Sequence, residues 1–359
     1  MSLTSEQIQE AAHACGFEIA GVASASPHAD FARFEHWTHS GKAASLHYLT
    51  DHRGAMRANP QTLLPGAKSI ICLGKLYNTD RPLSIDHSIP ETGWISRYAW
   101  GRDYHEILRP PLEGLLHRLT TLNGAPFRSK ICIDTAPLLE RSYARAAGLG
   151  WIGKNTCLIN QLVGSWFFLA ELLVDLAIKP DHPPPDRCGT CSRCIQACPT
   201  EAIVPNLNGG YDIDARLCIS YLTIEERGDV PKHLAAAQGH HIFGCDICQD
   251  VCPWNHRAYK SQQNVTNESG FAATIFAPSL TELSELTADE IRHIFRLTPI
   301  WRAKYEGFLR NVAIAMGNSG RNSMRLPLQR LAQHPSKLVA KAAGLALGRL
   351  DSLVNTSPY

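Results

Sequence analysis

Short apolar runs alternate with amphipathic segments in the first half of the chain. Thr4 or Ser5 can cap a helix that ends near Cys15, and the pattern then predicts a strand over residues 18–23. An apolar, β-branched run predicts a buried strand over 69–74, with Cys72 as a core residue. A strand over 130–134 and a helix over 138–147, which Gly148 ends, complete the pattern. This part therefore predicts an α/β fold.

The pattern changes after residue 178. Four prolines within 179–187 predict a stiff linker, and residues 188–255 then hold eight of the twelve cysteines. After a polar stretch over 261–269, the chain becomes rich in Ala and Leu and predicts three or four amphipathic helices. Within them, residues 311–317 align with 342–348, which favours HEAT-like helix pairs over a generic helical bundle. We expect three domains, at residues 1–179, 180–260 and 275–359.

Charge is unevenly distributed along the chain. The formal net charge is +2, but residues 301–359 hold nine Lys or Arg and only two Asp or Glu. A basic tail on a slightly acidic body predicts a polyanionic partner at that end of the molecule. The candidate contacts are Arg302, Lys304, Arg310, Arg321, Arg325 and Arg330.

The N-terminus has no signal peptide pattern, and the longest apolar stretch, 164–178, is interrupted by Glu171 and Asp175. We therefore expect a cytoplasmic protein that does not cross a membrane. In a reducing compartment, twelve cysteines favour metal ligands and core residues over disulfides.

The cysteine spacing has a specific chemistry. Cys188-x2-Cys191-x2-Cys194-x3-Cys198-Pro is the ligand run of bacterial ferredoxins, in which the fourth cysteine serves a different cluster. A second run, Cys245-x2-Cys248-x3-Cys252-Pro, lacks its first thiolate, which Cys218 can supply. The predicted sets are Cys188, Cys191, Cys194 and Cys252 for one [4Fe–4S] cluster, and Cys198, Cys218, Cys245 and Cys248 for the other. The alternative, a zinc ribbon, leaves both Cys-Pro endings unexplained.

Two further motifs concern the first domain. Gly148-x-Gly150-x-x-Gly153 follows a helix instead of a strand, so it does not predict a dinucleotide site. Asp103-x-His105 begins a pattern that places histidine on a corrinoid cobalt, but Leu108 replaces its glycine, so this mode of ligation is not supported. Asp134, at the end of a predicted strand, is either a helix cap or a general acid.

Long strings of the sequence resemble the epoxyqueuosine reductase family. They are residues 134–156 (DTAPLLERSYARAAGLGWIGKNT), the two cysteine runs, 218–225 (CISYLTIE) and 305–311 (YEGFLRN). The resemblance covers essentially the whole chain. It implies an α/β cobalamin-binding domain, a ferredoxin-type domain with two [4Fe–4S] clusters, and a HEAT-like helical tail that binds tRNA.

The resemblance also implies a reaction. The expected activity reduces epoxyqueuosine to queuosine at the wobble position of a tRNA with a GUN-type anticodon, as the last step of queuosine biosynthesis. An unidentified low-potential donor would supply electrons through the clusters to base-off cobalamin, and we expect a monomer. Asp134 matches the family's proton donor, and the implied corrinoid contacts are Arg57, Arg97, Asp134, Leu158, Ser220 and Asp246. The alternatives are an enzyme like the reductive dehalogenases, or an iron–sulfur electron-transfer protein.

Overall fold

A four-stranded sheet forms the centre of the N-terminal half in the computed structural model, which describes residues 3–87, 89–260 and 265–356. The predicted mixture of helices and strands is confirmed. Within this sheet every neighbouring pair of strands is antiparallel. The predicted strands at 18–23, 69–74 and 130–134 are all present. In sheet order the strands are β1 (Ile19–Ser24), β2 (Ser69–Leu76), β7 (Phe167–Val174) and β4 (Ser129–Cys132).

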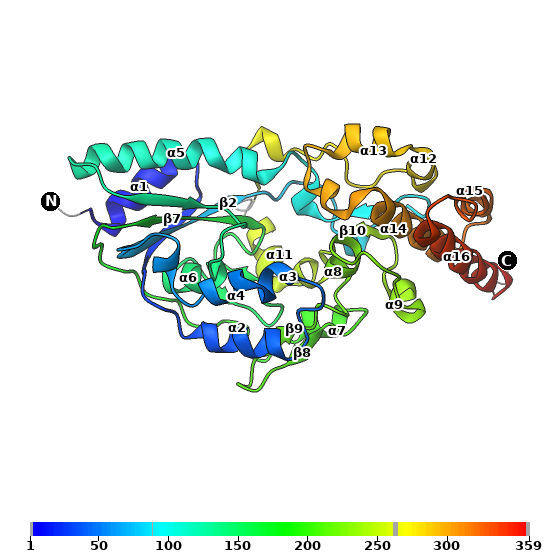
Figure 1. The fold of residues 1–359 in the computed structure, drawn as a ribbon, viewed down its shortest axis with the longest axis horizontal. Coiled ribbons are helices and arrows are strands. Elements are labelled where there is room, and N and C mark those ends of the chain that lie inside the picture. The colour runs from blue at the N-terminus through cyan, green and yellow to red at the C-terminus, as the bar shows by residue number, and fades with distance from the viewer. Residues whose placement is uncertain (1–2, 88, 261–264, 357–359) are drawn as a thin grey trace.

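Both faces of the sheet are covered by helices (Figure 1). Ile71 and Leu73 of β2 pack against α1 (Ser5–Ala14) and α5 (Tyr104–Asn123), whereas Ile70 and Cys72 face α6 (Glu140–Ala146). Thr4 caps α1, as one of the two predicted caps, and Cys72 is buried as predicted. Three further helices lie on the α6 side: α2 (Asp30–His39), α3 (His47–Thr50) and α4 (His52–Met56).

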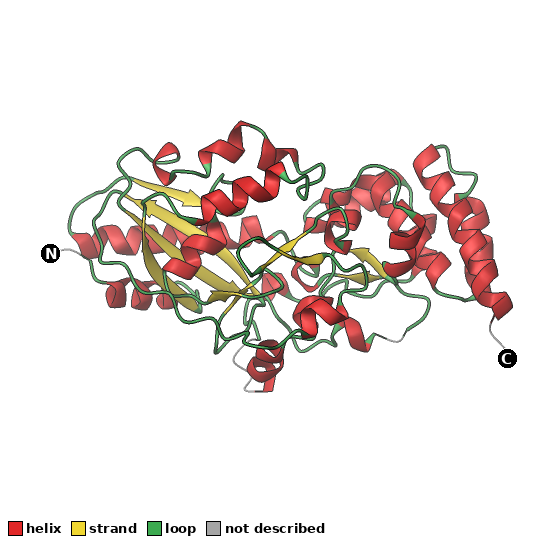
Figure 2. Cartoon of the chain, turned by 90° about the horizontal axis from the view of Figure 1, so that it is seen from below, coloured by secondary structure: helices red, strands yellow, loops and turns green. Residues whose placement is uncertain are grey.

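The cysteine-rich segment folds mainly as loops with short helices and strands (Figure 2). The preceding proline-rich linker is extended coil, and Asp181 ties it to the first domain by accepting hydrogen bonds from Val22 N (2.8 Å) and Ser5 Oγ (2.7 Å). The helices of this segment are α7 (Arg193–Ala197), α8 (Ile219–Ile224), α9 (Lys232–Ala237), α10 (Ile247–Asp250) and α11 (Pro253–Lys260). Its strands are β8 (Ile203–Pro205), β9 (Tyr211–Ile213) and β10 (His241–Phe243), of which β10 pairs in parallel with β3 (Trp94–Ile95).

The C-terminal part is helical, as predicted, but its described residues form five α-helices where three or four were expected. It contains α12 (Leu280–Glu285), α13 (Ala288–Phe295), α14 (Lys304–Asn318), α15 (Arg325–Leu331) and α16 (Lys337–Thr356). The two similar segments lie in α14 and α16, which pack so closely that a Cβ on Gly317 would meet Ala346 Cβ at 2.7 Å. The HEAT-like relationship itself stays a prediction.

The C-terminal helices share one hydrophobic core with the segments around β3 and β10. Trp94 and Phe243 belong to this core together with Phe308 and Met316 of α14. The tail is therefore firmly joined to the cysteine-rich segment. Among the described residues, no helix has both the length and the apolar character needed to cross a bilayer.

Candidate active site and cluster-binding cysteines

Asp134 lies in a loop between β4 and α6. The strand ends at Cys132, two residues earlier than predicted, and Asp134 adopts a left-handed backbone conformation with φ of 53°. The N-cap position of α6 is Leu139, so Asp134 does not cap the helix. Its side chain is 47% exposed. A left-handed, non-glycine residue with an accessible carboxylate is typical of a functional position.

The start of α5 brings two ionisable side chains to Asp134. Tyr104 donates a hydrogen bond from its hydroxyl to Asp134 Oδ2 (2.8 Å), and His105 Nε2 lies 3.8 Å from the same oxygen. Asp103 caps α5 and also contacts His105 Nδ1 (2.8 Å). This hydrogen bond raises the pKa of His105, and the charge of Asp134 adds to the effect. The imidazole is therefore held between two carboxylates.

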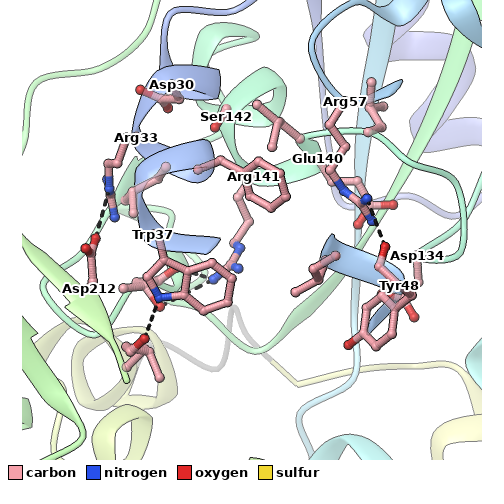
Figure 3. Close-up of a pocket in the computed structure, with 17 residues that line it drawn as sticks. Asp30, Arg33, Trp37, Tyr48, Arg57, Asp134, Glu140, Arg141, Ser142 and Asp212 are labelled. Atoms are coloured by element: carbon pink, nitrogen blue, oxygen red, sulfur yellow. Dashed lines mark hydrogen bonds and ion pairs between the residues drawn. The ribbon is translucent and has the colours of Figure 1, made fainter. Parts of the chain in front are cut away.

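A cavity of about 340 Å³ adjoins Asp134 (Figure 3). Aromatic and cationic side chains make up much of its wall. The rings come from Phe34 and Trp37 of α2 and from Tyr48 of α3. The cations are Arg33, Arg57 and Arg141.

The cationic side chains of the cavity are held by neighbouring groups. Arg33 pairs with Asp212 (3.1 Å), while Arg57 donates to the carbonyl oxygens of Tyr48 (3.2 Å) and Arg53 (2.9 Å). Such a lining offers flat apolar surface together with N–H donors, which suits a ring system that carries amide and phosphate groups.

The predicted corrinoid contacts do not all line this cavity. Arg57 and Asp134 do, whereas Leu158 is 4% exposed and Ser220 is half-buried beside the predicted cluster ligand Cys218.

Arg97 and Asp246 form one buried unit. The main-chain N–H of Arg97 donates to Asp246 (2.7 Å), and the Arg97 guanidinium donates to three carbonyls, including that of Pro82 (2.7 Å). Both residues hold neighbouring segments together.

The first predicted set of cysteines is brought together by the fold. Cys188, Cys191, Cys194 and Cys252 line a single small cavity of about 40 Å³. Cys252 comes from the second run, about 60 positions after the others. The exchange of the Cys-Pro thiolate between the runs, inferred from the spacing, therefore agrees with the geometry.

The second predicted set is also in proximity. Burial, and then the neighbouring thiols of Cys218 and Cys198, raise the pKa of Cys245. The neighbouring thiol of Cys157, burial, and the thiols of Cys245 and Cys218 raise the pKa of Cys248. Cys157, which the sequence analysis did not single out, thus contacts a predicted cluster ligand.

The glycine-rich motif has a structural explanation. Its residues enter a hairpin of β5 (Trp151–Ile152) and β6 (Leu158–Ile159), where a Cβ on Gly150 would meet Ile159 O at 2.2 Å. Lys154 in the hairpin turn donates to the carbonyls of Gly189 (2.7 Å) and Cys191 (2.9 Å). Asn155 donates to Cys248 O (3.3 Å), so the turn binds both cysteine runs.

Among the predicted tail cations, Arg302 lies nearest to the candidate site. It pairs with Glu225 (2.5 Å), and its guanidinium lies 5.4 Å from the centroid of the Tyr48 ring. Lys304 is exposed, with its amine 5.1 Å from the Trp301 ring centroid. The helical tail therefore reaches the edge of the cavity.

The other tail cations differ in their environments. Arg321 is exposed, and Arg325 and Arg330 form exposed ion pairs with Asp351 (2.6 Å) and Glu285 (2.8 Å). The prediction for Arg310 was wrong, because this side chain is 1% exposed. Its guanidinium donates to the carbonyls of Leu222 (2.5 Å), Glu226 (2.9 Å) and Gly228 (2.7 Å). The sequence analysis assigned Arg310 to the surface because of its charge, although its neighbours in the helix are apolar and buried.

Comparisons with known proteins agree with this arrangement. Residues 187–255 match the family described as "4Fe-4S double cluster binding domain", and residues 57–135 match "Epoxyqueuosine reductase QueG, DUF1730". The epoxyqueuosine reductase of Xanthomonas campestris is 37% identical over 96% of this chain and 95% of its own. That of Escherichia coli is 37% identical over 85% of this chain and 78% of its own.

Solved structures show the same fold. A crystal structure of an epoxyqueuosine reductase with an epoxyqueuosine-modified tRNA-Tyr stem loop has a TM-score of 0.84 and 27% identity, and covers 99% of this chain and 94% of that chain. The Bacillus subtilis enzyme, "with the Asp134 catalytic loop swung out of the active site", has a TM-score of 0.83 and 26% identity, and covers 98% of this chain and 94% of that chain.

The fold and the match to a double-cluster domain define an iron–sulfur oxidoreductase, in which the carboxylate of Asp134 lies beside a cavity. Identity above 30% along nearly the whole chain then fixes the family. This chain belongs to the epoxyqueuosine reductases, and the family assignment made from the sequence is confirmed.

Proposed function

We propose that this protein reduces epoxyqueuosine to queuosine at the wobble position of tRNAs with a GUN-type anticodon. It would use two [4Fe–4S] clusters and base-off cobalamin, with electrons from a low-potential donor. The observation that carries the proposal is the position of Asp134, held by Tyr104 beside a cavity lined by arginines and aromatic rings. The family's activity and the tRNA stem loop bound to a relative support the choice of substrate.

The reaction needs a proton donor at the departing oxygen. Converting an epoxide to an alkene consumes two electrons and two protons and releases water. Cobalamin, held in the cavity by side chains such as Arg57 and Arg141, would supply a strongly reducing centre next to Asp134. Asp134 protonates the oxygen as the C–O bond breaks, which is general acid catalysis.

Tyr104 and His105 support Asp134 in this role. The Tyr104 hydroxyl fixes Oδ2, and His105, whose pKa is raised by Asp103, is a source from which Asp134 regains its proton. Both ring nitrogens of His105 face carboxylates, Nδ1 that of Asp103 (2.8 Å) and Nε2 that of Asp134 (3.8 Å), so the imidazole is placed to pass a proton to Asp134.

The tail supplies contacts to the tRNA backbone in this proposal. Arg302 lies where the tail meets the cavity, so it would hold the anticodon close to Asp134. Exposed ion pairs contribute about 0–1 kcal/mol, so Arg325 and Arg330 can exchange their carboxylate partners for phosphates at little cost. Lys304 and Arg321 complete the proposed set.

Nucleoside analysis tests the proposal. Reduced, cluster-loaded protein is incubated without oxygen with an epoxyqueuosine-containing tRNA stem loop, with and without added cobalamin. We expect queuosine, identified by the loss of one oxygen in the mass spectrum, only when cobalamin is present. Queuosine formed equally well by protein free of corrinoid would contradict the proposed cofactor, and unchanged substrate in both would contradict the activity.

A further inference from the structure

The first set of cysteines lies at the surface of the molecule. Cys188, Cys191 and Cys194 are half-buried, and Gly189 and Thr190 between them are exposed. A Cβ on Gly189 would meet no described atom within 4 Å. The Cα of Gly189 therefore faces open space, and the loop that carries three of the four thiols borders solvent.

The second set lies on the side of the catalytic cavity instead. Cys198 Sγ accepts the N–H of Ala202 (3.3 Å), and the carbonyl of Ala202 accepts the N–H of Asp214 (2.8 Å). The two residues directly before Asp214 are Asp212 and Ile213, and both line that cavity. An electron that enters from the surface therefore reaches the first cluster before the second.

Two cations adjoin the first set. Arg193 and Lys154 line the same small cavity as its four thiols. Lys154 is fixed there, because its amine donates to the carbonyls of Gly189 (2.7 Å) and Cys191 (2.9 Å). Arg193, the first residue of α7, is exposed. One cation in the wall and one at the surface thus accompany the thiols.

Two further arginines extend this charge over the surface. Arg187 precedes the cysteine run and is exposed. Arg257 is also exposed, and its guanidinium lies 5.8 Å from the ring centroid of Trp254, which lines the cavity. Within the part of the chain that the structure describes, no carboxylate forms an ion pair with Arg187, Arg193 or Arg257. An acid in the same loop, Asp186, accepts a main-chain N–H with its carboxylate (2.7 Å). Positive charge therefore predominates around the first set.

We propose that Lys154, Arg187, Arg193 and Arg257 form an entry face, on which a small acidic electron-carrier protein docks and delivers one electron at a time to the first cluster. The inference rests on the proposed function, in which the clusters feed the reaction. In each docking event the carrier is oxidised by one electron and the cluster is reduced by one, with no bond or proton transferred. Two events supply the two electrons that the epoxide consumes.

The position of the entry face favours such a carrier over RNA. Electron transfer requires a partner close to the cluster, and two of these cations line the cavity that the thiols share. Figure 1 shows α7 at the lower edge of the molecule, well away from α15, which carries the candidate tRNA contacts Arg325 and Arg330. Complexes of electron carriers are small, and complementary charge speeds their formation.

Stopped-flow reduction of the cluster-loaded full chain, without oxygen, cobalamin or tRNA, tests the entry face. Fully reduced acidic flavodoxin is the probe, and bleaching of the cluster absorbance gives a second-order rate constant for the wild type, Arg187→Glu and Arg193→Glu. At low ionic strength each variant should react about tenfold more slowly, because the reversed charge removes electrostatic steering. Added salt should slow the wild type and narrow the difference, since it screens exposed charges.

Arg118→Glu is the matched control, because Arg118 is exposed on α5 and its substitution changes the net charge equally. Its rate constant with flavodoxin should equal that of the wild type. The methyl viologen radical, a small cation that needs no docking face, should reduce Arg187→Glu and Arg193→Glu at least as fast as the wild type. This second reductant verifies that their clusters are intact.

A wild-type rate constant with flavodoxin in both variants, or wild-type reduction that salt leaves unchanged, would overturn the proposal. Variants that lose binding of a tRNA stem loop but keep the wild-type rate constant would overturn it too, because the face would then bind RNA. If Arg193→Glu assembles no cluster, Arg187→Glu and the salt dependence of the wild type decide. No substrate or corrinoid is present, so the result is independent of whether the chain reduces epoxyqueuosine.

Discussion

Arg310 provides a quantitative test of how the helical tail is joined to the rest of the protein. Its guanidinium lies in α14 and donates to the carbonyls of Leu222, Glu226 and Gly228. It also contacts Asn311 Oδ1 (2.9 Å). Replacing Arg310 by Met keeps the aliphatic stem but removes every one of these donors.

The expected loss follows from the hydrogen bonds. Each bond from a charged donor contributes about 1.5–3 kcal/mol, so three carbonyls would lose about 5–9 kcal/mol in total. Burial lowers the pKa of Arg310 to about 10, because the buried cation has lost its hydration. Methionine does not carry this desolvation cost, so its absence offsets part of the lost hydrogen-bond energy. We therefore expect a net decrease of about 3–5 kcal/mol in the free energy of unfolding.

Urea unfolding of the anaerobic protein, followed by circular dichroism, measures this decrease. Arg321→Met is the matched control, because Arg321 is exposed and its loss should cost less than about 0.5 kcal/mol. At low temperature, the folded Arg310→Met protein should bind tRNA with an unchanged salt slope. A stability equal to that of the control, together with a salt slope reduced by about 0.7–0.9, would show that Arg310 contacts phosphate and would refute the reasoning.

Three further predictions concern the clusters and the proton supply. Cys252→Ala should damage the cluster of the first cysteine run, and iron counting with electron paramagnetic resonance would detect this loss. Loss of the second cluster alone would contradict the assignment of Cys252 to the first. Lys154→Met removes the donor to Gly189 and Cys191, so the first cluster should be lost faster to a chelator than in the wild type, and an equal rate would argue against this role. Asp103→Asn removes the main cause of the raised pKa of His105, so the alkaline fall in turnover should move to lower pH; an unmoved profile would exclude His105 as a proton source.

The sequence predicted the parts of the molecule that depend on local pattern or on fixed spacing. The run around Cys72 is uniformly apolar and became a strand buried on both faces. The cysteine sets followed from ligand chemistry, because a Cys-Pro ending turns its thiolate away from its own run. This rule predicted that Cys252 joins the first cysteine run, and Cys252 does line the same cavity as Cys188, about 60 residues earlier in the chain.

The parts that depend on tertiary contacts were less accessible. Tyr104 precedes Asp134 by 30 positions, and only the packing of α5 against the sheet brings them together. Glu171 was noted as an interruption of an apolar stretch, but its burial depends on the register of three strands. Arg310 looked like a surface cation because the sequence does not show which carbonyls α14 will meet.

Single-turnover reduction of an epoxyqueuosine stem loop by wild type and Asp134→Asn tests the central claim most directly. Both proteins carry clusters and cobalamin, and queuosine is counted by mass analysis while the corrinoid spectrum and tRNA binding are recorded in the same samples. The amide keeps the size of the side chain but holds no transferable proton, so the rate should fall about 10²–10⁴-fold with both bound partners retained. Turnover at the wild-type rate would show that Asp134 does not protonate the departing oxygen.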